Sequence, residues 1–159
     1  MRKMISNAED LIELLNQEFG TVGFTKVKDN WYLAREDCTQ VVHLQKSAYG
    51  EQYYLNIGVL LKRLDDTQYP DEHKCHIRIR PHMLAAHQNI PQMIDFEDNS
   101  VHPQERMTLL SRVVKEVILP FLDDMADLRS IRVSLKSDKY PNLIITLKTR
   151  EFLDRLIID

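Results

Sequence analysis

The feature that most constrains the fold is a regular alternation of side-chain polarity over Gln52–Leu61. Tyr53, Leu55, Ile57, Val59 and Leu61 alternate there with Tyr54, Asn56, Gly58, Leu60 and Lys62. Successive side chains of a β-strand point to opposite faces of its sheet, so this period predicts a strand with one face in the core. Leu60 interrupts the more polar face, which predicts that another segment covers part of that face.

Four more segments carry strand patterns and are joined by short turns. They are Thr21–Lys28, Trp31–Glu36, Thr39–Ser47 and His73–Arg80. Asp29-Asn30 supplies hairpin turn chemistry between the first two. In the last segment Cys75, Ile77 and Ile79 are expected to point inward, and Lys74, His76, Arg78 and Arg80 outward. Five consecutive strands with short connections predict an antiparallel meander.

An amphipathic helix is predicted ahead of these strands, at about Asn7–Phe19, because apolar residues recur there at helical spacing. Ser6 and Glu9 have the spacing of a capping box, in which each side chain satisfies a free amide of the first turn. Gly20 is expected to end the helix.

Helices are also predicted toward the C-terminus. A wide apolar stripe from Pro103 to Met125 predicts a long helix, which Pro120 is expected to kink or break. Residues 81–102 are predicted to be mostly loop, with a short helix at Met83–His87. Residues 128–148 fit either a helix or strands, and a final helix is expected around Phe152–Ile157, with Thr149 as a cap.

The predicted fold class is therefore α+β, with an antiparallel meander sheet of about five strands flanked by an N-terminal helix and C-terminal helices. A length of 159 residues suits a single domain, 1–159. No apolar run approaches the roughly 20 residues that span a bilayer, and the acids among the first ten residues disfavour a signal peptide. We expect a cytoplasmic protein without membrane partners, in which Cys38 and Cys75 are reduced thiols.

The charge balance bears on the class of partner. A formal net charge of −3 argues against a general nucleic-acid-binding role, which depends on a strongly basic surface. Local basic patches remain compatible with this balance.

One such patch is predicted on the last strand. Lys74, His76, Arg78 and Arg80 alternate with apolar residues, so a strand would gather them on one face. Cationic groups together on one face could bind a carboxylate, a phosphate or an acidic protein surface. The alternative is the solvated outer face of an antiparallel sheet, where basic residues also discourage edge-to-edge pairing.

A second candidate is polar. Gln45, Lys46, Ser47 and Asn56 lie at or near the adjoining ends of two predicted strands, and Gly58 within a strand often marks a bulge or a close backbone approach. The alternative interpretation is a structural network that satisfies buried amides and holds the strand register.

Other chemistry has little support. His73, His76, His82 and His87 lie near Cys75, but without the spacing of a zinc motif, and no metal or cofactor is expected. Neither cysteine has a nucleophile signature, Ser47 is not in a Gly-x-Ser-x-Gly elbow, and no glycine-rich phosphate loop is present. The sequence therefore favours a protein that is not an enzyme.

Short motifs carry a resemblance to a known family. Leu44-Gln45-Lys46-Ser47, Leu55-Asn56-Ile57-Gly58, His76-Ile77-Arg78-Ile79-Arg80 and Leu119-Pro120-Phe121-Leu122 are each similar to a motif of one family. In these motifs the chain resembles the bacterial family catalogued as domain of unknown function 4304, over roughly residues 8–125. The resemblance implies an α+β bacterial domain and supplies no catalytic residues to carry over.

Two functional hypotheses follow. The first is a non-enzymatic protein-binding module, such as an immunity protein or antitoxin, with Tyr49, Tyr53 or Tyr54, and Trp31 as exposed aromatic anchors. The second is a domain that binds or hydrolyses a small anionic ligand on a polar, basic sheet face. Its candidate residues, for a ligand or a partner, are Gln45, Lys46, Ser47, Asn56, His76, Arg78 and Arg80.

Overall fold

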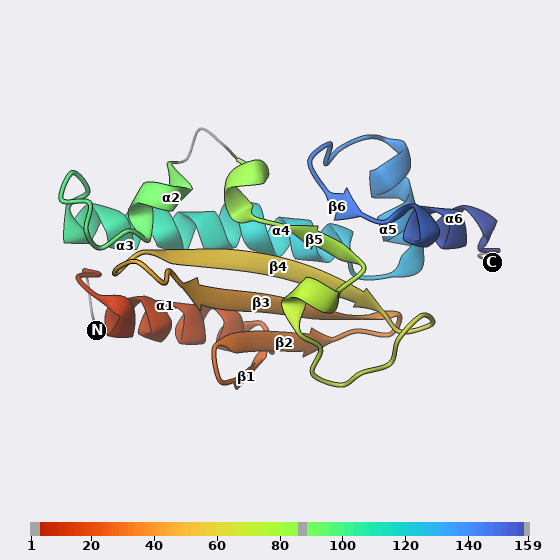
Figure 1. The fold of residues 1–159 in the computed structure, drawn as a ribbon, viewed down its shortest axis with the longest axis horizontal. Helices are drawn as coiled ribbons and strands as arrows, with labels where there is room; N and C mark the ends of the chain where they lie inside the picture. The colour runs from red at the N-terminus through yellow and green to blue at the C-terminus, as the bar shows by residue number, and fades with distance from the viewer. Residues whose placement is uncertain (1–3, 86–88, 158–159) are drawn as a thin grey trace.

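The computed structural model describes residues 4–85 and 89–157, and its centre is one antiparallel sheet (Figure 1). The strands lie side by side in sequence order: β1 Thr25–Val27, β2 Asn30–Ala34, β3 Cys38–Lys46, β4 Tyr53–Leu61, β5 Ile77–Ile79 and β6 Ile144–Ile145. The predicted α+β class and the meander are confirmed. The sixth strand comes from the C-terminal segment, where the sequence pattern fits both helix and strand.

Strands β3 and β4 form the longest ladder of the sheet, from Cys38 opposite Leu61 to Lys46 opposite Tyr53. The residues predicted to face inward from β4 are all in the main core: Tyr53, Leu55, Ile57, Val59 and Leu61. Alternation therefore predicted both the strand and its buried face.

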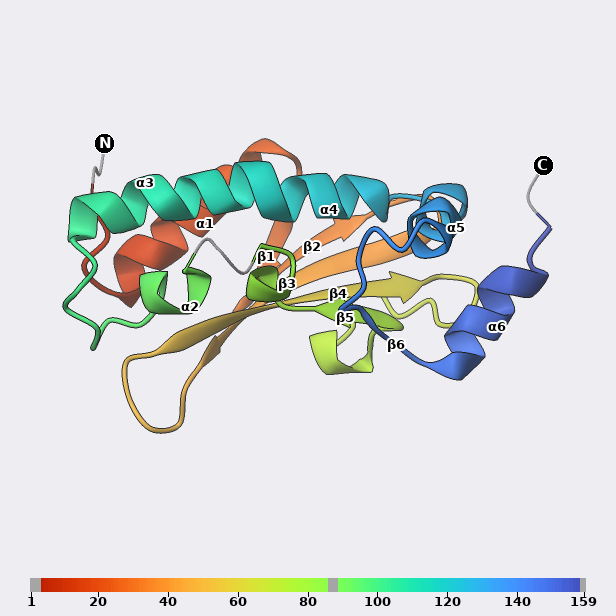
Figure 2. The ribbon, with the colours of Figure 1, turned by 90° about the horizontal axis from the view of Figure 1, so that it is seen from above.

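The longer helices of the described chain cover one face of the sheet. Figure 2 shows α1 (Ala8–Thr21), α3 (Pro103–Val113) and α4 (Leu119–Asp124) on the same side of the strands. Their apolar residues join the inward side chains of β4 in one core cluster. We call the opposite face, which carries Asn56 and Gly58 of β4, the open face.

The ends of α1 differ from the predicted ones by one or two residues. Asn7 is the N-cap and accepts the Asp10 amide at 3.0 Å, while Asp10 accepts the Ser6 amide at 2.9 Å. The capping box therefore uses Asn7 and Asp10 in place of Ser6 and Glu9, because asparagine and aspartate supply the same acceptors. The helix continues through Gly20 to Thr21.

The first hairpin is shorter than predicted. Since α1 reaches Thr21 and Gly23 then adopts a left-handed φ of 98°, β1 begins only at Thr25. The turn between β1 and β2 is Lys28-Asp29, with Lys28 at a φ of 55°, because Val27 pairs with Asn30.

Pro120 does not break the long helix. A π-helical turn, η4 (Val114–Ile118), joins α3 to α4, and Pro120 lies in the first turn of α4. The wider turn adapts the backbone to a residue that has no amide hydrogen and a bulky ring. Pro103 starts α3, as predicted.

Residues 128–148, whose sequence fits either a helix or strands, contain both a helix and a strand. Residues Leu128–Lys136 form helix α5, and β6 then pairs with β5. The final helix, α6, spans Leu147–Arg155, and its N-cap is Thr146, which accepts the Thr149 amide at 3.2 Å. The cap was predicted at Thr149, three residues after the N-cap that the structure shows.

Between β5 and α3 the chain has little regular structure, as predicted. A 3-10 turn, η2 (Pro81–Met83), and one short helix, α2 (Ile90–Met93), lie in this region. A helix was predicted at Met83–His87, but no α-helix is observed over the described part of this range, which ends at Ala85. His87 lies outside the described residues.

The segment before β5 corrects one prediction. Glu72–Lys74 form a 3-10 turn, η1, so β5 is limited to Ile77–Ile79. Ile77 and Ile79 point into the main core, but Cys75 does not, because it precedes the strand. Cys75 instead packs on the open face with Tyr32, Val41 and Leu60. The predicted cover over Leu60 is thereby confirmed.

In the described part of the chain, no helix combines the length and the apolar character that crossing a bilayer requires.

Candidate functional site

A cleft of about 690 Å³ lies on the open face. Its lining residues come from β3 and β4, from β5 with its two flanking 3-10 turns, and from the C-terminal segment that leads into β6. They are His43, Gln45, Asn56, Glu72, His73, Arg78, Ile79, Arg80, His82, Met83, Asn142 and Ile144. This volume suits a small organic molecule.

The strand register explains why these residues share one face. His43 lies opposite Asn56, and Arg78 lies opposite Gly58 on one side and Ile144 on the other. Directly opposed residues of antiparallel strands project from the same face, and so do residues two apart on one strand. Gln45 and Asn56 thereby reach the same surface as Arg78 and Arg80.

Gly58 permits the close packing beside the cleft. A Cβ atom at this position would lie 2.7 Å from the Cys75 Sγ and 2.9 Å from the Cys75 Cβ. The η1 segment can therefore lie directly on β4, and it brings Glu72 and His73 to the cleft wall. The expectation that Gly58 marks a close approach is confirmed.

Arg80 is held in place from two sides. Its Nε donates to Asn56 Oδ1 at 2.8 Å, and Asn56 Nδ2 donates to Gln45 Oε1 at 3.0 Å. The Arg80 guanidinium carbon also lies 4.8 Å from the centroid of the Tyr54 ring, a cation–π contact. Within the described residues, the two terminal nitrogens of Arg80 have no hydrogen-bond partner. A guanidinium oriented in this way can bind a carboxylate or a phosphate through two parallel hydrogen bonds.

Arg78, in contrast, is already paired. Its Nε and Nη2 donate to the two carboxylate oxygens of Glu72 at 2.9 and 3.3 Å. The side chain of Glu72 is only 8% exposed. The pair compensates the charge of Arg78 and leaves Arg80 as the available guanidinium of the cleft.

His43 adds a polar group with a defined orientation. Its Nδ1 lies 2.9 Å from Asn30 Oδ1, and Asn30 Nδ2 is near the Val27 carbonyl at 3.4 Å. Since the Asn30 oxygen can only accept, His43 Nδ1 carries the hydrogen, and Nε2 of the neutral ring is an acceptor.

Three predicted site residues do not line the cleft. Lys46 pairs with Glu51 at 2.9 Å on the β3–β4 hairpin, and Ser47 Oγ accepts the Tyr49 amide at 3.1 Å. His76 lies at the other end of β5, where its Nδ1 accepts the Leu61 amide at 2.9 Å. The structure thus brings together Gln45, Asn56, Arg78 and Arg80 from the predicted set.

Lys74, which was predicted to share the basic stripe, does not line the cleft either. It belongs to η1 and is exposed, 3.5 Å from an Asp71 carboxylate oxygen. The regular alternation of charge fails there because the backbone is a 3-10 turn and not a strand.

Sequence reasoning missed several lining residues. His43 could have been found by setting β3 against β4 in register, which places it opposite Asn56. Met83, Asn142 and Ile144 come from segments with no regular pattern, and Asn142 reaches the cleft through a hydrogen bond to the Met83 carbonyl at 3.3 Å.

The histidine cluster does not assemble as a unit. His73 and His82 line the cleft, while His76 is bonded to β4, and His87 lies outside the described residues. Over residues 4–85 and 89–157, no three histidine, cysteine or carboxylate side chains are grouped to hold a metal ion.

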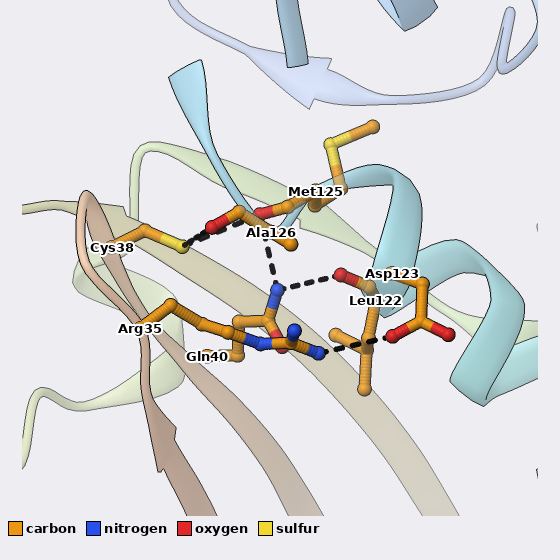
Figure 3. Close-up of polar contacts among 7 residues, drawn as sticks. All are labelled: Arg35, Cys38, Gln40, Leu122, Asp123, Met125 and Ala126. Atoms are coloured by element: carbon orange, nitrogen blue, oxygen red, sulfur yellow. Dashed lines mark hydrogen bonds and ion pairs between the residues drawn. The ribbon is translucent and has the colours of Figure 1, made fainter. Parts of the chain in front are cut away.

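A second polar cluster lies on the covered face and has a structural character (Figure 3). The amide nitrogen of Gln40 donates to the carbonyls of Leu122 and Met125 at 2.7 and 3.0 Å, and Cys38 Sγ lies 3.3 Å from the Met125 carbonyl. These bonds add donors to carbonyls at the C-terminus of α4, where the helix supplies few. The Leu122 carbonyl also accepts the Met125 amide at 3.2 Å. Burial raises the pKa of Cys38 to about 12, so this thiol is unsuited to act as a nucleophile.

Comparison with known proteins gives one match. A family model described as Domain of unknown function (DUF4304) matches residues 15–124. The match extends to the end of α4 and contains Gln45, Asn56, Arg78 and Arg80. No curated protein and no solved structure shows a significant match to the chain.

Proposed function

The chain belongs to the DUF4304 family of unknown function, and we propose from the cleft that it is a binding domain for a small anionic ligand. The observation that carries the proposal is the state of Arg80. Asn56 and Tyr54 hold its guanidinium in place, while its terminal nitrogens have no protein partner in the described chain. Preorganised donors of this kind lose little conformational entropy when an anion binds.

Binding is better supported than catalysis. The residues lining the cleft include no serine, threonine or cysteine, and Glu72 is committed to Arg78. Cys75 is packed beneath η1, and burial raises the pKa of its thiol to about 12. The cleft therefore offers donors and acceptors for recognition and no activated nucleophile among its lining residues.

The experiment is a calorimetric titration with two probes, hexanoate and hexyl phosphate. We expect at least one to bind, and Arg80→Gln to weaken that binding by about tenfold to a hundredfold, as for a lost charge-assisted hydrogen-bond pair. Arg63→Gln is the matched control, because Arg63 is exposed and does not line the cleft. Absence of binding by both probes, or equal binding by Arg80→Gln, would refute the proposal.

A protein-binding role keeps one supporting observation. Tyr49 is 98% exposed at the tip of the β3–β4 hairpin, where an aromatic side chain could anchor a partner. Trp31 and Tyr53 do not support it, because they are 1% and 9% exposed and belong to the core. Trp31 donates its indole hydrogen to Asn16 of α1 at 3.0 Å. Tyr54 is half-buried and lies against Arg80, so Tyr49 is the candidate anchor for an immunity-protein or antitoxin role. Loss of a captured partner in Tyr49→Ala would test that role.

A further inference from the structure

Resting on the proposed function, we infer that the ligand is a small organic carboxylate with an apolar body. The carboxylate binds Arg80, and the apolar body lies against Met83 and Ile144. Three features of the cleft support this choice: its net charge, the position of Glu72 and its exposed apolar side chains.

The charge of the cleft suits a monoanion. Its lining includes Arg78, Arg80 and Glu72, so with neutral histidines the net charge is +1. One carboxylate balances this charge, whereas a phosphate monoester at pH 8 carries nearly two negative charges. The second charge would lie in the same cleft as the carboxylate of Glu72, and like charges in a partly desolvated site repel each other strongly.

The cleft also presents exposed apolar side chains. Met83 is 43% exposed and Ile144 is 60% exposed, and both line the same cavity as Arg80. The Met83 amide donates to the Arg80 carbonyl at 2.9 Å, so the two residues are within one backbone turn. An apolar group bound beside Arg80 would remove both side chains from water.

The two apolar residues belong to segments that are far apart in sequence and are joined at the cleft. Asn142 donates to the Met83 carbonyl at 3.3 Å, and Ile144 lies opposite Arg78 across the β5–β6 pair. The apolar wall is thus held next to the cationic groups. A ligand with a negative head and an apolar body matches this arrangement.

The test compares three probes at pH 8: hexanoate, acetate and hexyl phosphate. We expect hexanoate to bind at least about tenfold more tightly than acetate. It has four more methylene groups, and since burial of each is worth about fourfold in affinity, burial of two of them is sufficient. We also expect hexanoate to bind more tightly than hexyl phosphate. In Glu72→Gln, which frees Arg78 and removes a negative charge, the preference should move toward hexyl phosphate.

Variants of the apolar wall complete the test. In the double variant Met83→Gln, Ile144→Thr, the advantage of hexanoate over acetate should fall to less than threefold. Val133→Thr is the control, because Val133 is 62% exposed on α5 and does not line the cleft. Both variants change exposed side chains, and thermal unfolding would verify that they remain folded.

The outcomes separate this inference from the proposed function. If hexyl phosphate binds as tightly as hexanoate in an Arg80-dependent way, anion binding stands and the carboxylate class is wrong. If hexanoate binds no better than acetate, or keeps its advantage in the double variant, the apolar contact is wrong. If no probe binds, the proposed function itself fails.

Discussion

Asn56 accepts the Nε hydrogen of Arg80 across 2.8 Å, although the two residues are 24 positions apart in the sequence. Asn56 is 6% exposed and donates to Gln45, so its side chain is fixed at the cleft wall and can orient Arg80. This relationship links the strand with the clearest sequence pattern to the guanidinium that we propose as the ligand anchor.

Asn56→Leu should therefore weaken anion binding by about threefold to tenfold, as for one lost hydrogen bond that orients a donor. The loss should be smaller than in Arg80→Gln, because the charge remains. NMR can follow the Nε–H signal of Arg80, which should exchange with water faster in the variant. Asn99→Leu, in an exposed loop, is the control, and unchanged exchange in Asn56→Leu would argue against a positioning role.

Gly58→Ala should destabilise the fold by about 1 to 3 kcal/mol, because the added methyl group overlaps Cys75. Cys75→Ala removes the closer of the two contacts, so the double variant should lose less stability than the two single variants added together. Urea unfolding of all three variants measures this coupling. Strict additivity would show that the Cys75 sulfur is not the obstacle.

Gln40→Met should cost about 0.5 to 1.5 kcal/mol, because the carbonyls of Leu122 and Met125 lose the hydrogen bonds from the Gln40 amide. Each carbonyl keeps one other donor, the Met125 amide and the Cys38 thiol, respectively. Methionine preserves length and removes the amide. Chemical denaturation gives the difference in unfolding free energy. Gln104→Met on the exposed side of α3 is the matched control and should change stability little. If Gln40→Met had the same unfolding free energy as the wild type, the Gln40 hydrogen bonds would contribute no net stability.

The stability of the protein should fall as His76 becomes protonated. Burial lowers the pKa of His76 below its usual range, with Asp65 acting in the opposite direction, and Nδ1 must stay unprotonated to accept the Leu61 amide. Because the unfolded chain then binds the proton more readily, this stabilisation is complete above about pH 6.5, the ordinary histidine value, and is lost as the pH falls below it.

Unfolding free energies at pH 7.5, 6.5 and 5.5 would measure this dependence. His76→Gln keeps an acceptor but does not titrate, so its stability should depend less on pH than that of the wild type. His73→Gln, which changes an exposed ring, should retain the wild-type dependence. An identical dependence in His76→Gln would exclude His76 as its source.

Period-2 alternation was sufficient to predict β4 and its buried face, and it placed Asn56 and Arg80 each on the more polar side of its own strand. It works there because the strand has a partner on each side and one face in the core. The same rule failed before Ile77, since η1 has the composition of a strand but lies where the chain turns over the open face. A local pattern does not contain that tertiary constraint.

Other errors had equally local causes. The cap of α1 shifted by one residue because Ser6, Asn7 and Asp10 all carry suitable acceptors. Trp31 was predicted to be exposed, but α1 lies over it, and Asn16 satisfies its indole hydrogen. The far wall of the cleft was missed because a strand of two residues, β6, leaves no readable period.

The cleft is built from two parts of the chain with different relationships to the family. The segment matched by the DUF4304 model, 15–124, contains Arg80, Asn56 and Gln45, whereas Asn142 and Ile144 lie beyond it. In the outer wall, β6 pairs with β5 through two residue pairs, and Asn142 donates to the Met83 carbonyl. If Arg80 anchors an anion as we propose, substitutions at Asn142 and Ile144 should change which apolar group binds beside it while Asn56 still orients the guanidinium. The same anion-binding residues would then be compatible with ligands of different shape.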